Sequence, residues 1–314
     1  MKPPRRATGS GTSLWRVDVF ILPEAEEAAM PLIESVFGRS PICYEDFESR
    51  RTVVSVFLEE AGLWTEEARQ ALRAGLKRIR EAGLRTGSGR IRCTRMRKED
   101  WAESWKRHFH PLVVGDRLLI KPTWSRRRPG RGQEEILLDP GLSFGTGHHP
   151  TTRFCLEEMI AFGQGHEGRR PPSLLDIGTG SGILAMAGAK LGYAPVEGFD
   201  NDPVAVQVAR ENARLNGVLD RVTFVRRDVA RMGTLRGKTH AMVCANLTVD
   251  LLLEYRGQIA GRVSEGGRMV LAGILGRQFD RVLEGYEELG WVLRRRQRGG
   301  EWTSGAFSFR GNKL

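Results

Sequence analysis

The stretch of residues 174–202 most strongly constrains how this chain can fold. It starts with a short apolar run, 174–177, which predicts a β-strand. Gly178, Gly180 and Gly182 follow, and glycines are needed where the backbone adopts positive φ or lies against a ligand. A helix of small residues and a second strand, 195–199, come next, and this strand ends at Asp200. This order predicts an α/β sheet that binds a nucleoside, because ribose hydroxyls can donate to a carboxylate at the strand end.

The spacing of the glycines separates two kinds of nucleoside ligand. A dinucleotide loop reads Gly-x-Gly-x-x-Gly and holds a pyrophosphate at the helix N-terminus. Here the pattern is Gly-x-Gly-x-Gly, and Asp176 lies two residues before Gly178. A carboxylate facing the loop would repel a pyrophosphate but suit a cationic amine. S-adenosyl-L-methionine has such an amine, a ribose and no phosphate, so it is the predicted cofactor; a glycine turn without a ligand is the alternative.

Composition sets the class of protein. The chain has 314 residues, of which 40% are hydrophobic and 28% charged, as in soluble globular proteins with about two domains. No apolar run approaches the roughly 20 residues of a membrane helix, so no membrane contact is expected. Residues 1–13 are basic and lack the apolar centre of a signal peptide, which predicts a disordered tail. The four scattered cysteines favour a reducing cytoplasm and no metal site.

The net charge of +11 has two interpretations. It favours an acidic partner such as RNA, or it reflects arginines on solvated faces. Basic clusters occur at Arg126, Arg127, Arg128 and Arg131, and again at 294–296 with Arg298. Few aromatic residues interleave with them, so the sequence predicts at most a weak RNA contact through these loops.

Residues 14–97 show a separate pattern of predicted strands and helices. Strands are expected at 14–22, 42–47, 52–58 and 91–96, and helices at 23–37 and 66–81. Thr65 is expected to cap the second helix, and Gly83 to stop it. The order β-α-β-β-α-β predicts a ferredoxin-like α+β domain. No catalytic cluster is present in it, so binding is its expected task.

A connector and a larger domain follow. Residues 98–112 predict a helical connector, with Trp101, Trp105 and Phe109 on one face for packing. The domain 113–314 then begins with strands at 113–121 and 135–138. Residues 139–152 contain glycines, prolines and His148 beside His149. Ordering such a segment costs much conformational entropy, so a function beyond that of a linker is expected. A solvated pair of histidines is the alternative there.

Two polar residues of this larger domain are candidates for the site. Thr151 or Thr152 is expected to cap a helix reaching residue 161, whose N-terminus can hold the carboxylate of the methionine half of the cofactor. Asn246 ends the strand 240–245, at the sheet edge where ligands bind. Its side-chain carbonyl can accept from a substrate N–H, and a cap on the next helix is the alternative role. The strands 291–296 and 302–309 predict an antiparallel end to the sheet.

Taken together, these motifs make the chain resemble a known family. The glycine loop Asp-Ile-Gly-Thr-Gly-Ser-Gly at 176–182 is typical of class I (Rossmann-like) methyltransferases. The segment Phe-Gly-Thr-Gly-His-His-Pro-Thr-Thr at 144–152 is more specific. With the front domain, the connector motif Trp105-Lys-x-x-Phe109 and Ala245-Asn-Leu247, it resembles the methyltransferases that modify the eleventh protein of the large ribosomal subunit.

The resemblance implies a cofactor, a substrate and a set of site residues. It places cofactor contacts at Thr152, Gly178, Asp200 and Asn246, with Phe144 and His148 near the methionine end. Asp176 and Gly180 are also expected to bind the cofactor, because they belong to the glycine loop described above. The implied activity is methylation of lysine side chains and the N-terminal amine of that ribosomal protein. The resemblance also implies that the front domain grips the substrate and moves relative to the catalytic one.

Asn246 is the candidate catalytic residue, and two alternatives to the implied function stay open. Methyl transfer from a sulfonium to an amine depends on alignment, which an accepting carbonyl can provide. A nucleic-acid N-methyltransferase often follows the Asn with an aromatic residue that stacks on a flipped base, whereas Leu247, Thr248 and Val249 follow here. A non-catalytic ribosome-binding protein would retain the fold and bind no cofactor.

Overall fold

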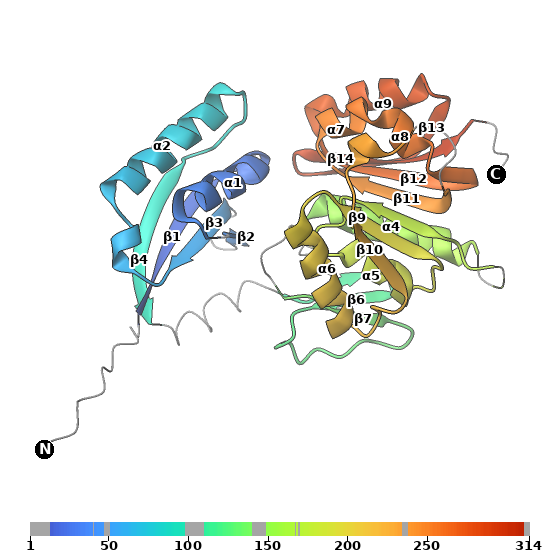
Figure 1. Cartoon of the computed structure of the whole chain (residues 1–314), viewed down its shortest axis with the longest axis horizontal. Coiled ribbons are helices and arrows are strands. Elements are labelled where there is room, and N and C mark those ends of the chain that lie inside the picture. The colour runs from blue at the N-terminus through green and yellow to red at the C-terminus, as the bar shows by residue number, and fades with distance from the viewer. Residues whose placement is uncertain are drawn as a thin grey trace, which may run out of the picture. The chain divides into compact units, whose positions relative to one another are not determined.

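The computed structural model describes most of the chain, in two compact units that meet at residues 109 and 110 (Figure 1). The described residues are 13–39, 41–46, 51–97, 110–139, 149–166, 168, 170–233 and 238–310. The junction falls inside the predicted connector, whose residues 98–109 lie outside the described part, as do residues 1–12 of the predicted tail. None of the described helices is long and apolar enough to cross a membrane.

The first unit is a four-stranded antiparallel sheet with two helices on one face. Its elements are β1 (Ser13–Ile21), η1 (Pro23–Ala25), α1 (Glu26–Phe37), β2 (Ile42–Asp46), β3 (Arg51–Leu58), η2 (Ala61–Leu63), α2 (Glu66–Glu81) and β4 (Arg90–Arg97). The strand order is β2-β3-β1-β4. Alternate residues such as Val17, Val19 and Val54 point to one face and pack with Ile33 of α1 and Leu72 of α2.

The order of elements in this unit is the predicted one, and Thr65 caps α2 by accepting from the N–H of Ala68 at 3.2 Å. Its assignment to the ferredoxin-like class stays a prediction. One expected helix is divided, because the 3-10 turn η1 precedes α1 where 23–37 was predicted to be continuous.

The second unit opens with a small sheet that the sequence predicts only in part. β5 (Leu112–Val114) and β6 (Leu118–Lys121) are antiparallel, and β7 (Glu134–Leu137) lies parallel to β6. The expected single strand 113–121 is therefore wrong. Gly115 adopts φ +55° and starts a turn that separates its two halves.

A seven-stranded sheet forms the centre of the second unit. Its elements are α4 (Pro150–Gln164), β8 (Leu174–Ile177), α5 (Ile183–Lys190), β9 (Val196–Asp200), α6 (Pro203–Leu215), β10 (Val222–Arg226), η4 (Val229–Arg231), β11 (His240–Asn246), α7 (Val249–Glu254), α8 (Arg256–Ala260), β12 (Val263–Leu275), η5 (Gly276–Gln278), α9 (Phe279–Glu287), β13 (Trp291–Gly299) and β14 (Trp302–Phe309). The strand order is β10-β9-β8-β11-β12-β14-β13. The first five strands in this order are parallel, and β14 is antiparallel to both its neighbours, which confirms the predicted end of the sheet.

Helices cover both faces of this sheet (Figure 1). Phe154 of α4, Leu184 of α5 and Ala209 of α6 share one apolar core with Leu174 and other sheet residues. Leu252 of α7, Ile259 of α8 and Phe279 of α9 share another core with Leu175. Because Leu174 and Leu175 are adjacent in β8, they point to opposite faces, and the sheet is buried on both sides.

Strand register brings three predicted site residues to one edge. Ile177 of β8 lies opposite Phe199 of β9 and Ala245 of β11. The residues that follow these three in the chain are Gly178, Asp200 and Asn246. These residues therefore lie side by side at the carboxyl ends of neighbouring parallel strands, where ligands bind in open α/β sheets.

Candidate active site

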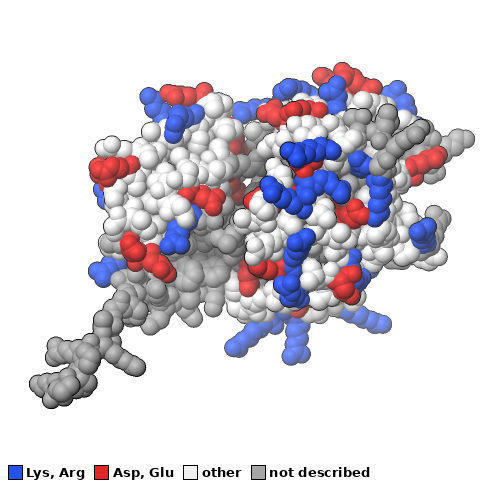
Figure 2. All heavy atoms as spheres, in the orientation of Figure 1, with Lys and Arg blue, Asp and Glu red and all other residues white. Residues whose placement is uncertain are grey.

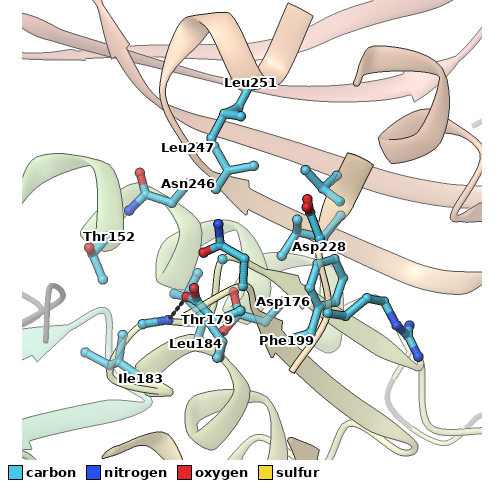
Figure 3. A pocket seen from close by; sticks show the side chains of 17 residues that line it. Thr152, Asp176, Thr179, Ile183, Leu184, Phe199, Asp228, Asn246, Leu247 and Leu251 are labelled. Carbon is cyan, nitrogen blue, oxygen red and sulfur yellow. Dashed lines mark hydrogen bonds between the residues drawn. The ribbon is translucent and has the colours of Figure 1, made fainter. Parts of the chain in front are cut away.

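A cavity of about 250 Å³ opens at the carboxyl ends of β8, β9 and β11 (Figure 3). Six of the eight predicted site residues line it: Thr152, Asp176, Gly178, Gly180, Asp200 and Asn246. The other two, Phe144 and His148, lie outside the described residues.

The glycine loop is shaped for close approach. Gly178 has φ +71°, and a Cβ there would lie 2.5 Å from Cδ2 of Leu247. Gly182 has φ +81° at the N-cap of α5, where a Cβ would lie 3.0 Å from Cβ of Ala209. A side chain at either position would strain the backbone and displace a neighbour, so both glycines are required by the loop itself.

Asp176 is buried beneath this loop. Its Oδ2 accepts from the hydroxyl of Thr179 at 2.6 Å, and its side chain is almost inaccessible to solvent. Burial raises the pKa of its carboxyl to about 7, against the lowering effect of the Thr179 hydrogen bond. A cationic group placed nearby would favour the ionised form and restore a lower pKa.

Asp200 is fixed by the backbone around it. Its Oδ2 accepts from the N–H of Gly180 at 3.0 Å, and its Oδ1 accepts from the N–H of Asp202 at 3.1 Å. Each carboxylate oxygen has two lone pairs, so both oxygens can still accept from a diol. The hydrogen bond to Gly180 also ties the strand end to the glycine loop.

Helix α4 begins two or three residues earlier than the sequence predicts. His149 is the N-cap residue and Pro150 the first helical residue, so Thr151 and Thr152 lie within the first turn and the predicted cap was wrong. Proline is favoured at this position because its fixed φ suits the helix and its missing N–H would be unpaired there anyway. Thr152 is 1% exposed and lines the cavity, and its Oγ1 has no hydrogen-bond partner in the described structure.

His149 is built into the start of α4. Its Nδ1 lies 2.6 Å from Oγ1 of Thr151, and its ring meets Trp302 edge-on with 4.9 Å between centroids. Burial lowers the pKa of His149 to about 4, so the ring is neutral near pH 7. A solvated histidine pair is therefore wrong for this residue.

Asn246 ends β11 and does not cap the following helix. The N-cap of α7 is Thr248, two residues later. Figure 3 shows the side chain of Asn246 on the same side of the cavity as Thr152. Gly273 of β12 has φ +80°, and a Cβ there would lie 3.0 Å from Oδ1 of Asn246. Gly273 was not among the residues predicted for the site, although a glycine inside a strand often marks such a close approach.

Apolar side chains and Asp228 complete the cavity. Leu247, Leu251 and Phe199 form an apolar part of the cavity wall that was not predicted from the sequence. Asp228 lines the cavity near them and caps η4 by accepting from the N–H of Ala230 at 2.9 Å. Its place in the cavity wall allows Asp228 to face a ligand.

The sheet order, the glycine loop below Asp200 and the cavity at Asn246 define a class I S-adenosylmethionine-dependent methyltransferase. The chain belongs to the ribosomal protein L11 methyltransferase (PrmA) family, whose model matches residues 13–309.

Individual relatives support this assignment. A ribosomal protein L11 methyltransferase of Geobacter sulfurreducens is 44% identical over 210 residues, which are 67% of this chain and 66% of that protein, slightly under two thirds of its length. One from Pelobacter propionicus is 36% identical over 299 residues, 95% of this chain and 88% of the relative. The crystal structure of a ribosomal protein L11 methylase from Lactobacillus delbrueckii subsp. bulgaricus superposes with a TM-score of 0.55 at 29% identity. It covers 64% of this chain and 100% of that one.

Proposed function

We propose that the chain is an S-adenosyl-L-methionine-dependent N-methyltransferase that modifies lysine side chains and the N-terminal amine of ribosomal protein L11. Family membership supports this substrate, because the relatives are named for it. The observation that carries the proposal is the cavity at the carboxyl ends of β8, β9 and β11. It brings Gly178, Asp200 and Asn246 together with Thr152 of α4.

The residues of the cavity fit this cofactor. The unpaired, buried hydroxyl of Thr152 at a helix N-terminus suits the carboxylate of the methionine half. Asp176 suits its ammonium group, Asp200 its ribose hydroxyls, and the bare backbone at Gly178 allows close contact. When bound, S-adenosyl-L-methionine supplies an electrophilic methyl group on a sulfonium.

Asn246 orients the substrate amine in this proposal. Its neutral carbonyl accepts an N–H and aims the nitrogen lone pair, without the negative charge that would favour the protonated amine. Asp176 and Asp200 are already engaged by Thr179 and the Gly180 N–H, so we assign neither as a base. In this proposal, water accepts the proton from the amine.

The first unit serves as the substrate-recognition domain in this proposal. Its described part is built around an apolar core of its own beneath α1 and α2. A domain of this kind would bind the folded substrate protein, and methyl transfer would take place in the second unit. The cytoplasm is the proposed location, since the proposed substrate is a ribosomal protein.

A weak RNA contact is a further part of the proposal, limited to one of the two predicted loops. Arg126, Arg127, Arg128 and Arg131 are exposed and form no ion pair with a described residue. The second cluster is largely engaged: Arg295 pairs with Glu158 at 3.0 Å and with Glu157 at 2.8 Å. RNA methylation itself is disfavoured, since Leu247 and not an aromatic residue follows Asn246 in the cavity wall.

Calorimetry with S-adenosyl-L-methionine tests the proposal at Thr152. Thr152→Val removes only the unpaired hydroxyl, so it should leave the fold intact and weaken binding by about 1.5–3 kcal/mol, the scale of a hydrogen bond to a charged group. Thr151→Val is the matched control, because Thr151 bonds His149 and does not line the cavity. It should lower stability more than affinity. No heat of binding for the unaltered protein would favour a non-catalytic ribosome-binding protein.

A further inference from the structure

A second cavity of about 460 Å³ lies on the α7–α9 face of the seven-stranded sheet. Its floor is made by Leu175 of β8 and Glu197 of β9, and its walls come from η4, the start of β11 and the residues after α8. Among its described residues, the connection from β10 to β11 contains no helix longer than η4. The sheet is therefore less covered here than under α7 or α9.

The wall of this cavity is strongly basic. Arg227, Arg231, Lys238 and Arg262 line it, and Glu197 is the one carboxylate among the described lining residues. Glu197 is already engaged, because it pairs with Lys238. The three arginines form no ion pair with any carboxylate in the described part of the chain. A group of basic side chains is also visible on this unit between α6 and the α7–α8 helices (Figures 1 and 2).

His240 lies at the base of these charges. It is 1% exposed, and neither ring nitrogen has a hydrogen-bond partner among the described residues. Nε2 lies 3.7 Å from a carboxylate oxygen of Glu197, beyond hydrogen-bond distance. Burial lowers the pKa of His240 and Glu197 raises it, while Lys238, Arg262 and Arg227 lower it further. The three cationic side chains therefore lie near the buried ring of His240.

Arg262 presents a second unused donor. Its Nη2 donates to the carbonyl of Gly233 at 2.9 Å, which anchors the side chain against the end of η4. Its Nε is buried and has no partner in the described structure. Buried donors without partners are rare in native proteins and call for a ligand or another explanation.

We propose that this cavity binds a phosphate group. The unprotonated oxygens of a phosphate group accept hydrogen bonds, which matches a wall of arginine and lysine donors. The planar guanidinium groups of Arg231 and Arg262 suit paired phosphate oxygens. A neutral His240 adds one N–H donor. Four cations against one carboxylate leave enough positive charge for a dianion. The phosphate comes either from an RNA backbone or from a small phosphate compound, and the site is separate from the residues that orient the methylated amine.

Binding measurements on the full chain test this proposal. Inorganic phosphate, pyrophosphate and a short single-stranded RNA are titrated into the unaltered protein and into Arg231→Gln and Arg262→Gln. Arg281→Gln, an exposed arginine on α9, is the control that removes the same charge elsewhere. The Arg231 side chain forms no hydrogen bond or ion pair with another described residue, so its variant should fold even if Arg262→Gln does not. Calorimetry with S-adenosyl-L-methionine checks that each variant is folded.

The expected result is weaker phosphate or pyrophosphate binding by about tenfold in Arg231→Gln and Arg262→Gln, on the scale of a lost charged hydrogen bond, with little change in Arg281→Gln. An equal loss of RNA affinity would identify the backbone of RNA as the source of the phosphate. RNA affinity that falls only as it does in the control would identify a small phosphate compound. The proposal is overturned if the unaltered protein binds none of the three probes, or if Arg231→Gln binds them as well as Arg281→Gln does.

Discussion

At the scale of single residues, Asn246 carries the chemistry that we propose. Asn246→Ala removes the acceptor, and Asn246→Asp keeps an acceptor but adds a charge that favours the protonated, unreactive amine. Both variants should lose turnover by on the order of 10²-fold or more, while cofactor affinity falls less. Turnover and calorimetric affinity, measured on the same preparations, give the comparison.

A capping role for Asn246 makes the opposite prediction. Asp caps a helix as well as Asn does, so Asn246→Asp would then stay nearly fully active. The structure already weakens this alternative, because Thr248 holds the N-cap position of α7. An active Asp variant would return Asn246 to a structural role.

Asp176 should make cofactor affinity depend on pH. Burial raises the pKa of its carboxyl from 3.8 to about 7, so the group is largely protonated below that pH. The ionised form binds an ammonium group better, so affinity for S-adenosyl-L-methionine should increase as the pH rises through about 7. Asp176→Asn should abolish this increase, and a rise that persists in the variant would point to another group.

The same shift predicts how stability varies with pH. Between 3.8 and about 7 the folded chain holds a proton that the unfolded chain has lost. The stabilisation from this group is therefore complete below that window and is lost as the pH rises through it. Urea unfolding of Asp176→Asn should show a smaller decline over the same window.

At the scale of elements, the glycine loop leaves little room for a side chain. Gly178→Ala adds strain at φ +71° and brings a Cβ to 2.5 Å from Leu247, so it should cost about 1–3 kcal/mol of stability and also reduce cofactor affinity. Gly192→Ala is the matched control, because φ is +90° but nothing lies within 4 Å. In the control, thermal unfolding should show lower stability from backbone strain, and calorimetry should show unchanged cofactor affinity. Equal cofactor affinity in both variants would contradict the role of the loop.

The elements that the sequence predicts well are those with local signals. The apolar run of β8, the glycines after it and the acid at the end of β9 are each visible within a few residues, and the edge rule for parallel strands then places Asn246 beside them. The start of α4 was wrong because two threonines gave a stronger cap signal than His149 before Pro150. The break at Gly115 was missed although the glycine signals it.

Features that depend on distant residues could not be read from the sequence. Arg295 belonged to a predicted basic cluster, yet its partner Glu158 is 137 residues away and neutralises it. The apolar wall forms only when the fold brings Leu251 of α7 and Phe199 of β9 to the same cavity. The unpaired nitrogens of His240 likewise become apparent only from its three-dimensional surroundings.

At the scale of the whole molecule, the two units should separate binding of the cofactor from recognition of the protein. A shortened chain that begins at His110 keeps β5 and every described residue that lines the cavity. It should bind S-adenosyl-L-methionine about as well as the full chain but lose methylation of folded ribosomal protein L11. Calorimetry and a methylation assay on both chains test this, and full activity of the shortened chain would rule out the proposed task of the first unit.

The central claim is that the full chain transfers methyl groups to amines of ribosomal protein L11. Its most direct test is mass spectrometry of purified ribosomal protein L11 after incubation with the full chain and S-adenosyl-L-methionine. Asn246→Ala run in parallel provides the inactive control. We predict mass increases in whole methyl steps, with fragment masses that place them on lysine side chains and the N-terminal amine, and far less product with the variant. An unchanged mass with an enzyme that binds the cofactor, or methyl groups on other atoms, would contradict the account.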